Sequence, residues 1–187
     1  MVICNLCIVG LSALALVACE KPASEPASAA VSPSATVTTP TATVPVILDG
    51  EGLKAGSTPT LVAFGSPRAT VEAAVKAALG SDPVVSENPD CPTGSATVLD
   101  WGDAMQVVIQ NGAFVGWRAD DATARTASGL HVGSTRAEAQ AGPDFSLPET
   151  TLDAVEISVD GVGGFLTSAG PDGTVEQLFA GDICMAR

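Results

Sequence analysis

Two copies of one short pattern organise this chain: Gly65-Ser66-Pro67-Arg68-Ala69 and Gly133-Ser134-Thr135-Arg136-Ala137. Each copy is predicted to open a helix. In the first copy, Ser66 can cap the helix, and Pro67 takes the first helical position, where its missing N–H costs nothing. An apolar stripe then continues to Leu79, and Gly80 ends the helix. In the second copy the helix is short, because Gly142-Pro143 stops it soon after it starts. Its Thr135 and Glu138 have the spacing of a capping box.

Three strand-like segments follow each predicted helix. They are residues 96–101, 105–110 and 113–118 after the first copy, and residues 154–159, 164–167 and 174–180 after the second. Asn111-Gly112 is a strong hairpin turn, because both residues tolerate positive φ, and Asp160-Gly161 supplies a further turn. Apolar residues alternate at Val155, Ile157 and Val159, which indicates a sheet with one buried face.

This order of elements predicts one α+β domain over residues 46–187. It consists of two tandem α-β-β-β units, about 46–120 and 121–187, with helices packed on one face of an antiparallel sheet. The arrangement resembles the β-lactamase inhibitor protein (BLIP-like) fold and the small lipoproteins of outer-membrane protein assembly. The resemblance covers about residues 61–187 and rests on element order and on the two Gly-Ser-x-Arg-Ala openings. It implies a binding role, and no functional residue carries over from it.

The N-terminus has the pattern of an export signal. Residues 8–18 form an apolar run that is shorter than the roughly 20 residues needed to span a bilayer, and it has the length of a signal-peptide core. The first 18 residues contain no Lys or Arg, although such signals usually begin with positive charge. The run ends in Leu16-Val17-Ala18-Cys19, which resembles the lipobox of bacterial lipoproteins. The resemblance implies that residues 1–18 are removed and that Cys19 carries the lipid anchor. Because Glu20 and not Asp follows, it also implies the outer membrane, facing the periplasm, in preference to the inner membrane.

Residues 19–45 are expected to form a lipidated cysteine followed by a disordered tether. After Glu20 the segment is nearly all Ala, Ser, Thr, Pro and Val, with no aromatic residue and no Gly. Such a segment cannot bury enough apolar surface to offset the entropy lost on ordering. As a flexible coil it would hold the domain roughly 30 Å from the membrane.

The chain is strongly acidic, with 21 acidic and 8 basic residues and a formal net charge of -13. This charge excludes nucleic acid as a partner, because phosphate contacts need a basic face. Between residues 144 and 186 there is no Lys or Arg, and the acids are Asp144, Glu149, Asp153, Glu156, Asp160, Asp172, Glu176 and Asp182. This run is either a solvated face that keeps the protein soluble or a surface that steers a basic protein partner.

Two of the five cysteines are left for the folded domain. Cleavage removes Cys4 and Cys7, and lipidation uses Cys19. The remaining pair, Cys91 and Cys184, would meet an oxidising compartment, which predicts one disulfide. A redox or metal pair is the alternative, but neither cysteine lies in a C-x-x-C motif.

Catalytic and metal-binding patterns are weak, so we expect no enzyme, no metal and no cofactor. His131 is the single histidine, and no Gly-x-Ser-x-Gly elbow supports a Ser-His-Asp triad. Two acid pairs leave open a hydrolase that uses paired carboxylates: Asp100 with Asp103, and Asp120 with Asp121. Three turns offer oxygen ligands for calcium without the EF-hand spacing: Asp120-Asp121, Asp160-Gly161 and Asp172-Gly173.

Four residues are candidates for an interaction surface: Trp101, Trp117, Arg68 and Arg136. The tryptophans lie at the ends of predicted strands and would form a binding patch if exposed, or pack in the core if buried. The arginines hold equivalent places in the two motifs. They either satisfy nearby carboxylates and carbonyls or form a paired anion site at two helix N-termini.

These observations together predict a non-enzymatic, membrane-anchored envelope lipoprotein that presents its domain to another envelope protein. The alternative is an envelope protein that binds a small ligand or Ca²⁺, and the paired-acid hydrolase is a remote third.

Overall fold

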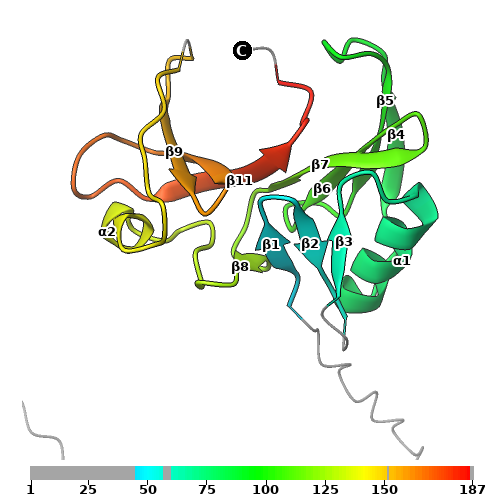
Figure 1. Cartoon of the computed structure of the whole chain (residues 1–187), viewed down its shortest axis with the longest axis horizontal. Coiled ribbons are helices and arrows are strands. Elements are labelled where there is room, and N and C mark those ends of the chain that lie inside the picture. Colours follow the sequence, from blue (N-terminus) through cyan, green and yellow to red (C-terminus); the bar gives the residue numbers. More distant parts are fainter. Residues whose placement is uncertain (1–44, 57–59, 151, 186–187) are drawn as a thin grey trace, which may run out of the picture. The chain divides into compact units, whose positions relative to one another are not determined.

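The computed structural model describes residues 45–56, 60–150 and 152–185. The predicted signal peptide, Cys19 and almost all of the tether therefore lie outside the described residues. The helices are α1 (Arg68–Leu79) and α2 (Arg136–Gln140) (Figure 1). The strands are β1 (Ile47–Asp49), β2 (Gly52–Lys54), β3 (Leu61–Ala63), β4 (Val84–Asn88), β5 (Ala96–Asp100), β6 (Gln106–Gln110), β7 (Ala113–Ala119), β8 (Arg125–Thr126), β9 (Val155–Val159), β10 (Val162–Leu166) and β11 (Val175–Gly181).

The strands form two sheets. The larger sheet has seven strands in the order β4-β5-β6-β7-β11-β10-β9, and every neighbouring pair in it is antiparallel. Its two halves meet at β7 and β11, where Arg118 lies opposite Phe179. The smaller sheet has four strands in the order β3-β2-β1-β8, and β8 runs parallel to β1.

The expected α+β fold is wrong, because the domain is mostly β. The described residues contain eleven strands and two helices, of 12 and 5 residues, and these helices do not form a layer over the sheet. The four-stranded sheet was not predicted. Its strands have only two or three residues each, too few for an alternating apolar pattern to show. Gly142-Pro143 limits α2 to little more than one turn, so it covers little of the sheet.

One buried cluster joins the two sheets and the helices. It contains Leu48 and Leu53 of the smaller sheet, Val71 and Val75 of α1, and Trp117 of β7. Trp117 is fully buried, and its Nε1–H donates to the backbone oxygen of Asp49 at 3.1 Å. This hydrogen bond ties the central strand of the larger sheet to β1.

The two Gly-Ser-x-Arg-Ala stretches make matching backbone contacts. The N–H of Gly65 donates to the carbonyl of Phe114 on β7 at 2.7 Å, and the N–H of Gly133 donates to the carbonyl of Val175 on β11, also at 2.7 Å. Both glycines have positive φ, 88° and 93°, which a residue with a side chain rarely adopts. Each stretch thus ties the start of a helix to a central strand of the larger sheet.

The predicted helix ends are correct for α2 and partly correct for α1. The capping box of Thr135 and Glu138 is present, and Gly80 ends α1 with a left-handed φ of 76°. Ser66 does not cap α1. The N-cap residue is Pro67, and no side-chain hydrogen bond caps the helix. The backbone oxygen of Ser66 accepts a hydrogen bond from the N–H of Phe114 on β7 at 2.8 Å.

Candidate functional site

A pocket of about 270 Å³ lies beside α2 and brings His131, Ser134 and Glu138 together. The turn that ends in Gly133 and the capping box at the start of α2 place these side chains on one side of the helix start. The sequence pointed to His131 as a single histidine and gave no connection to Ser134 or Glu138. The signal that could have connected these three residues is that each lies in or near the predicted capping box.

The Ser134–His131 pair has the contact of a nucleophile and its base, but the wrong proton arrangement. Ser134 Oγ lies 3.1 Å from His131 Nδ1. The same nitrogen lies 2.9 Å from the backbone oxygen of Gly129, which can only accept a hydrogen bond. Nδ1 therefore carries the proton and cannot take one from Ser134. Ser134 is also only 4% exposed, so the pair orients the imidazole ring and does not activate a nucleophile.

The carboxylate of Glu138 is held in its charged form. The backbone N–H of Thr135 donates to Glu138 Oε2 at 2.6 Å, and the Thr135 hydroxyl donates to the same oxygen at 2.9 Å. These two hydrogen bonds, with a smaller contribution from His131, lower the pKa of Glu138 below its usual value.

This lowered pKa predicts a pH-dependent effect of the substitution Glu138→Ala. Because the folded-state pKa lies below the unfolded-state value, Glu138 stabilises the protein fully above the unfolded-state value. That stabilisation is lost as pH falls through the folded-state pKa. The variant should therefore have a lower Tm than the parent at neutral pH, and the difference should shrink as the pH falls below the ordinary Glu pKa of about 4.3. Thermal unfolding across this range measures it. Gln140→Ala, an exposed change in the same helix, is the control and should show no such trend.

The two tryptophans do not form a binding patch. Trp117 is fully buried, because β7 is the central strand of the larger sheet, and it is excluded from any interaction surface. Trp101 is half-buried against the core, and its Nε1–H donates to the backbone oxygen of Ser81 at 3.0 Å. Both indole groups therefore serve the fold.

The two arginines each have a local partner. Arg68 Nε lies 3.1 Å from Glu72 Oε2, one turn further along α1. The guanidinium of Arg136 donates to the backbone oxygen of Ala169 in the loop between β10 and β11. Figure 1 shows α1 and α2 well apart, so the arginines do not form a paired anion site.

The first acid of each predicted carboxylate pair is held by other side chains. Asp100 accepts a hydrogen bond from Gln106 Nε2 at 3.1 Å. Asp120 accepts from Arg118 Nε at 3.0 Å and from Gln177 Nε2 at 2.6 Å. These partners give both carboxylates a structural role, and the arrangement lends the paired-acid hydrolase no support.

The turns considered for calcium are not assembled into one loop. Asp160 and Asp172 lie in the turns at opposite ends of β10. The carboxylate of Asp120 is already engaged by Arg118 and Gln177. A calcium site takes six or more oxygen ligands around one ion, and this separation does not provide them.

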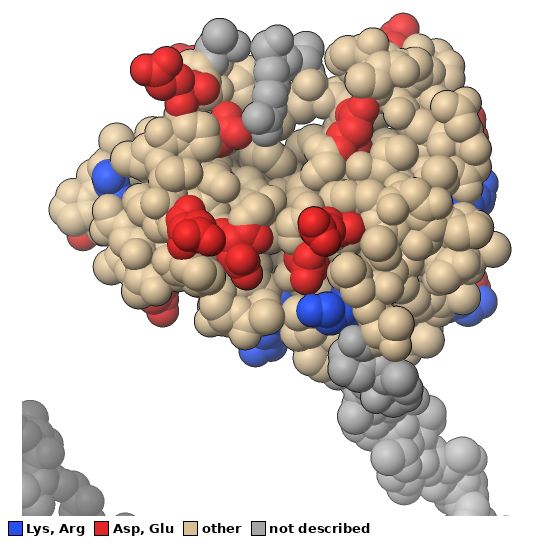
Figure 2. All heavy atoms as spheres, viewed as in Figure 1, with Lys and Arg blue, Asp and Glu red and all other residues tan. Residues whose placement is uncertain are grey.

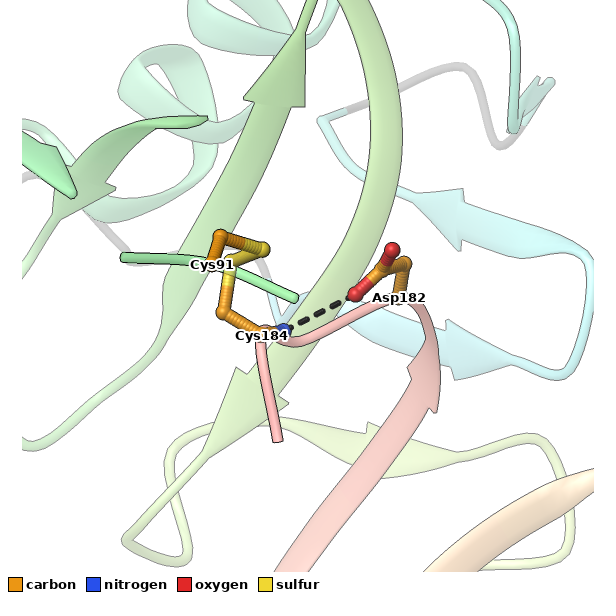
Figure 3. Close-up of side chains that lie close together, drawn as sticks. All are labelled: Cys91, Asp182 and Cys184. Carbon is orange, nitrogen blue, oxygen red and sulfur yellow. Dashed lines mark hydrogen bonds between the residues drawn. A yellow bond between two sulfur atoms is a disulfide. The ribbon is translucent and has the colours of Figure 1, made fainter. Parts of the chain in front are cut away.

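Cys91 and Cys184 form a disulfide, as the cysteine count predicts. Figure 3 shows Asp182 beside the pair, with the N–H of Cys184 donating to Asp182 Oδ1 at 2.9 Å. Within the part of the chain that the structure describes, these are the three metal-capable side chains that lie within reach of a single ion. Cysteine binds zinc as a thiolate, and both sulfurs are bonded to each other, which leaves the Asp182 carboxylate as the one available ligand of the three. The disulfide links the loop after β4 to the C-terminal segment.

Acidic side chains gather where three turns meet. Gly50, between β1 and β2, packs against Gly161, between β9 and β10. The N–H of Asp160 donates to the backbone oxygen of Pro143 at 3.0 Å. These backbone contacts bring together the turns that carry Asp49, Glu51, Asp144 and Asp160, which we call the acidic turn surface. Lys54 forms an ion pair with Asp49 at 3.4 Å, so three of the four acids carry its uncompensated charge. Figure 2 shows acidic side chains grouped on the face turned to the viewer, with few basic ones.

The predicted acidic run near the C-terminus is not one continuous surface. Glu156 is only 5% exposed, on β9, and Asp182 accepts hydrogen bonds from Thr93 and Cys184. The acidic turn surface instead includes Asp49 and Glu51 from the start of the domain. Sequence reasoning missed these two, because only the fold brings them beside residues that follow about 100 positions later.

None of the helices in the described residues is long and apolar enough to cross a membrane. No protein-family model and no curated protein matches the chain. Among solved structures, it is similar to the crystal structure of the uncharacterized protein yfeY from Escherichia coli, with 15% sequence identity and a TM-score of 0.45. That similarity covers 74% of this chain and 98% of the other, and it carries no argument about function.

Proposed function

We propose that this chain is a lipid-anchored protein of the bacterial cell envelope, without catalytic activity, whose β-rich domain binds another envelope protein. The observation that carries the proposal is Leu16-Val17-Ala18-Cys19 at the end of an apolar run of signal-peptide length. The composition of residues 20–45 supports a tether behind the anchor. The Cys91–Cys184 disulfide is compatible with an exported protein, because disulfides persist in oxidising compartments.

Two features of the domain support binding in place of catalysis. The proton on His131 Nδ1 leaves Ser134 without a base, and Asp120 is engaged by two neighbouring side chains. The acidic turn surface, in a chain of net charge -13, would attract a basic partner and speed its association. It would also be repelled by anionic lipid, so the domain would stand away from the membrane and the anchor alone would hold it there. The outer membrane, facing the periplasm, is the proposed location.

The anchor is tested by the substitution Cys19→Ser in the full chain. Cells that express the parent are fed an alkyne fatty acid, and the purified protein is probed for incorporated label. The parent should carry the label and sediment with membranes. The variant should carry none, because it lacks the thiol that receives the acyl chains.

Cys7→Ser is the matched control, because Cys7 lies within the segment that cleavage is expected to remove. It should be labelled as strongly as the parent. A Cys19→Ser variant that is still labelled would show that the anchor lies elsewhere, and an unlabelled parent would show that there is no lipid anchor.

A small-ligand role is the second candidate, favoured by the pocket beside α2. Its volume of about 270 Å³ lies just below the range of about 300 to 1,000 Å³ of ligand pockets, and His131 Nδ1 already lies 2.9 Å from the backbone oxygen of Gly129. The imidazole therefore offers Nε2 to a ligand. A thermal-shift panel of sugars and carboxylates on the parent and on His131→Ala tests this role. A ligand that raises Tm only in the parent supports it, and a flat response to the whole panel speaks against it.

A further inference from the structure

The two edges of the seven-stranded sheet differ. At the β9 edge, Ser146 and Ser158 exchange backbone hydrogen bonds of 2.9 and 3.0 Å, so the segment before β9 covers part of that edge. At the other edge, β4 pairs with β5 on one side, and no described strand lies on its outer side. Among the described residues, the sheet therefore ends in an uncovered strand at β4.

The register identifies which backbone groups of β4 face outward. The N–H of Trp101 donates to the carbonyl of Met105, just before β6, so the backbone N–H and C=O groups of Trp101 point to the β6 side of β5. In an antiparallel ladder the direction of the backbone N–H and C=O groups alternates from one residue to the next, so these groups of Leu99 and Thr97 also point to β6. The residues opposite these two on β4 are Val85 and Glu87.

It follows that β4 presents a regular row of unpaired groups. Val84, Ser86 and Asn88 direct their N–H and C=O groups to β5. They lie opposite those residues of β5 whose own N–H and C=O groups point away from β6 and toward β4. Val85 and Glu87 direct theirs outward, where no backbone partner lies among the described residues. Two donors and two acceptors at strand spacing match the backbone of one added strand.

The side chains of β4 suit a partner strand and do not block one. Val84 is 72% exposed and Val85 is 48% exposed, and as neighbours in a strand they point to opposite faces. The strand has no lysine, no bulge and no internal proline, which are three of the usual protections of an edge. Its one charged side chain is Glu87, whose carboxylate accepts a hydrogen bond from the Thr97 hydroxyl on β5 at 3.0 Å. Pro83 and Pro89 lie just outside it and limit the added strand to the length of β4.

The charged residues around β4 indicate which kind of partner strand could pair with it. Asp82, Glu87 and Asp90 lie on or next to it, and all three are exposed. Lys76 pairs with Asp82, and β4 itself contains no basic residue. A second copy of the same edge would place acid against acid, whereas a strand that carries Lys or Arg would meet opposite charge.

We propose that β4 is a docking edge, and that it takes an extended, β-branched segment bearing Lys or Arg from a partner protein as an eighth strand of the sheet. The partner's backbone pairs with Val85 and Glu87, its apolar side chains cover Val84 and Val85, and its basic side chains meet Glu87 and its acidic neighbours. This inference rests on the binding role proposed above and names where and how the partner is held.

The first test uses the full chain in detergent and a synthetic peptide in which Lys alternates with Val and Thr. Backbone amide exchange should slow at Val85 and Glu87 when the peptide is added, and change little at Val84 and Ser86, whose amides are already bonded to β5. A peptide with Glu in place of every Lys should bind at least about tenfold more weakly. Equal binding of both peptides, or protection elsewhere without protection of Val85 and Glu87, would overturn the proposal.

Two variants sharpen this test. Val85→Pro removes an outward N–H without removing a bond to β5, and it should weaken peptide binding about tenfold. Val85→Thr keeps the N–H and the branched shape and is the matched control. If Val85→Pro does not fold, Glu87→Lys replaces it, and this variant should reduce the preference for the Lys peptide, because Asp82 and Asp90 remain. An unchanged affinity in Val85→Pro, or an unchanged preference in Glu87→Lys, contradicts the docking edge.

A cross-linking experiment in cells separates the two proposals. A photo-reactive amino acid is placed at position 85, on the edge, or at position 51, on the acidic turn surface. A cross-link to a second protein at position 85 supports the docking edge. A cross-link only at position 51 overturns the edge and leaves the binding role standing. A cross-link at position 85 to a second copy of this chain overturns the basic partner, and no cross-link at either position counts against the binding role itself.

Discussion

Replacing Trp117 with alanine is expected to lower the free energy of unfolding by about 4 kcal/mol. Trp117 is fully buried on the central strand of the larger sheet, and its Nε1–H donates to the backbone oxygen of Asp49 in the smaller sheet. The substitution removes a large apolar side chain, leaves a cavity between the two sheets and takes the donor away from Asp49. Urea unfolding followed by circular dichroism measures the loss.

Two further variants divide this loss into its parts. Trp117→Phe keeps most of the buried apolar volume and loses the hydrogen bond, so it should cost about 1 to 2 kcal/mol. Trp101→Ala removes the half-buried indole that bonds to Ser81, and it should cost less than Trp117→Ala. If Trp117→Ala were no more destabilising than Trp101→Ala, the two sheets would not share the core described here.

Removal of the disulfide by the double substitution Cys91→Ala and Cys184→Ala is expected to cost about 4 kcal/mol, from the entropy of closing a long loop in the unfolded chain. The two cysteines are 93 residues apart. The same loss should follow reduction of the parent protein, and urea unfolding of both proteins measures it. The double variant should not respond to reductant, which provides the internal control.

The disulfide also has a local consequence for the C-terminal segment. The N–H of Asp182 donates to the carbonyl of Val115 at 2.9 Å, so the segment lies along β7, and Cys184 secures its end. Amide exchange in the double variant should rise first at Asp182 and its neighbours, and in the loop around Cys91. Exchange that rises only in step with global unfolding would show that the disulfide acts on the unfolded chain alone.

Local patterns in the sequence predicted six strands after residue 95, β5, β6, β7, β9, β10 and β11, each to within about two residues, and missed β8. The Asn111-Gly112 turn joins β6 to β7, and Asp160-Gly161 joins β9 to β10, each with positive φ at both residues. These features depend on residues that are neighbours in the chain, which is why they could be read without the fold. The cysteine pair was predictable for another reason, since counting left only one possible partner.

The fold class could not be read in the same way. The pairing of β8 with β1 joins residues about 78 positions apart in strands of two and three residues, too short for any periodic signal. The helix stretches were recognised, but whether they form a layer depends on their length and on what else covers the sheet. The four-stranded sheet shares one buried cluster with the larger sheet, and it forms by pairing of strands that are far apart in the sequence.

The candidate sites also separate into features that local sequence patterns predict and features that depend on the tertiary structure. The capping box of Thr135 and Glu138 is a local pattern and was predicted from the sequence, whereas the proton position on His131 depends on a carbonyl that the folded turn brings to it. The acidic turn surface and the uncovered edge of β4 exist only in three dimensions. The first joins turns from both ends of the domain. The second depends on which strand lies at the end of the sheet without an outer neighbour. Burial and strand order are set by the whole chain, and no short stretch of the sequence contains them.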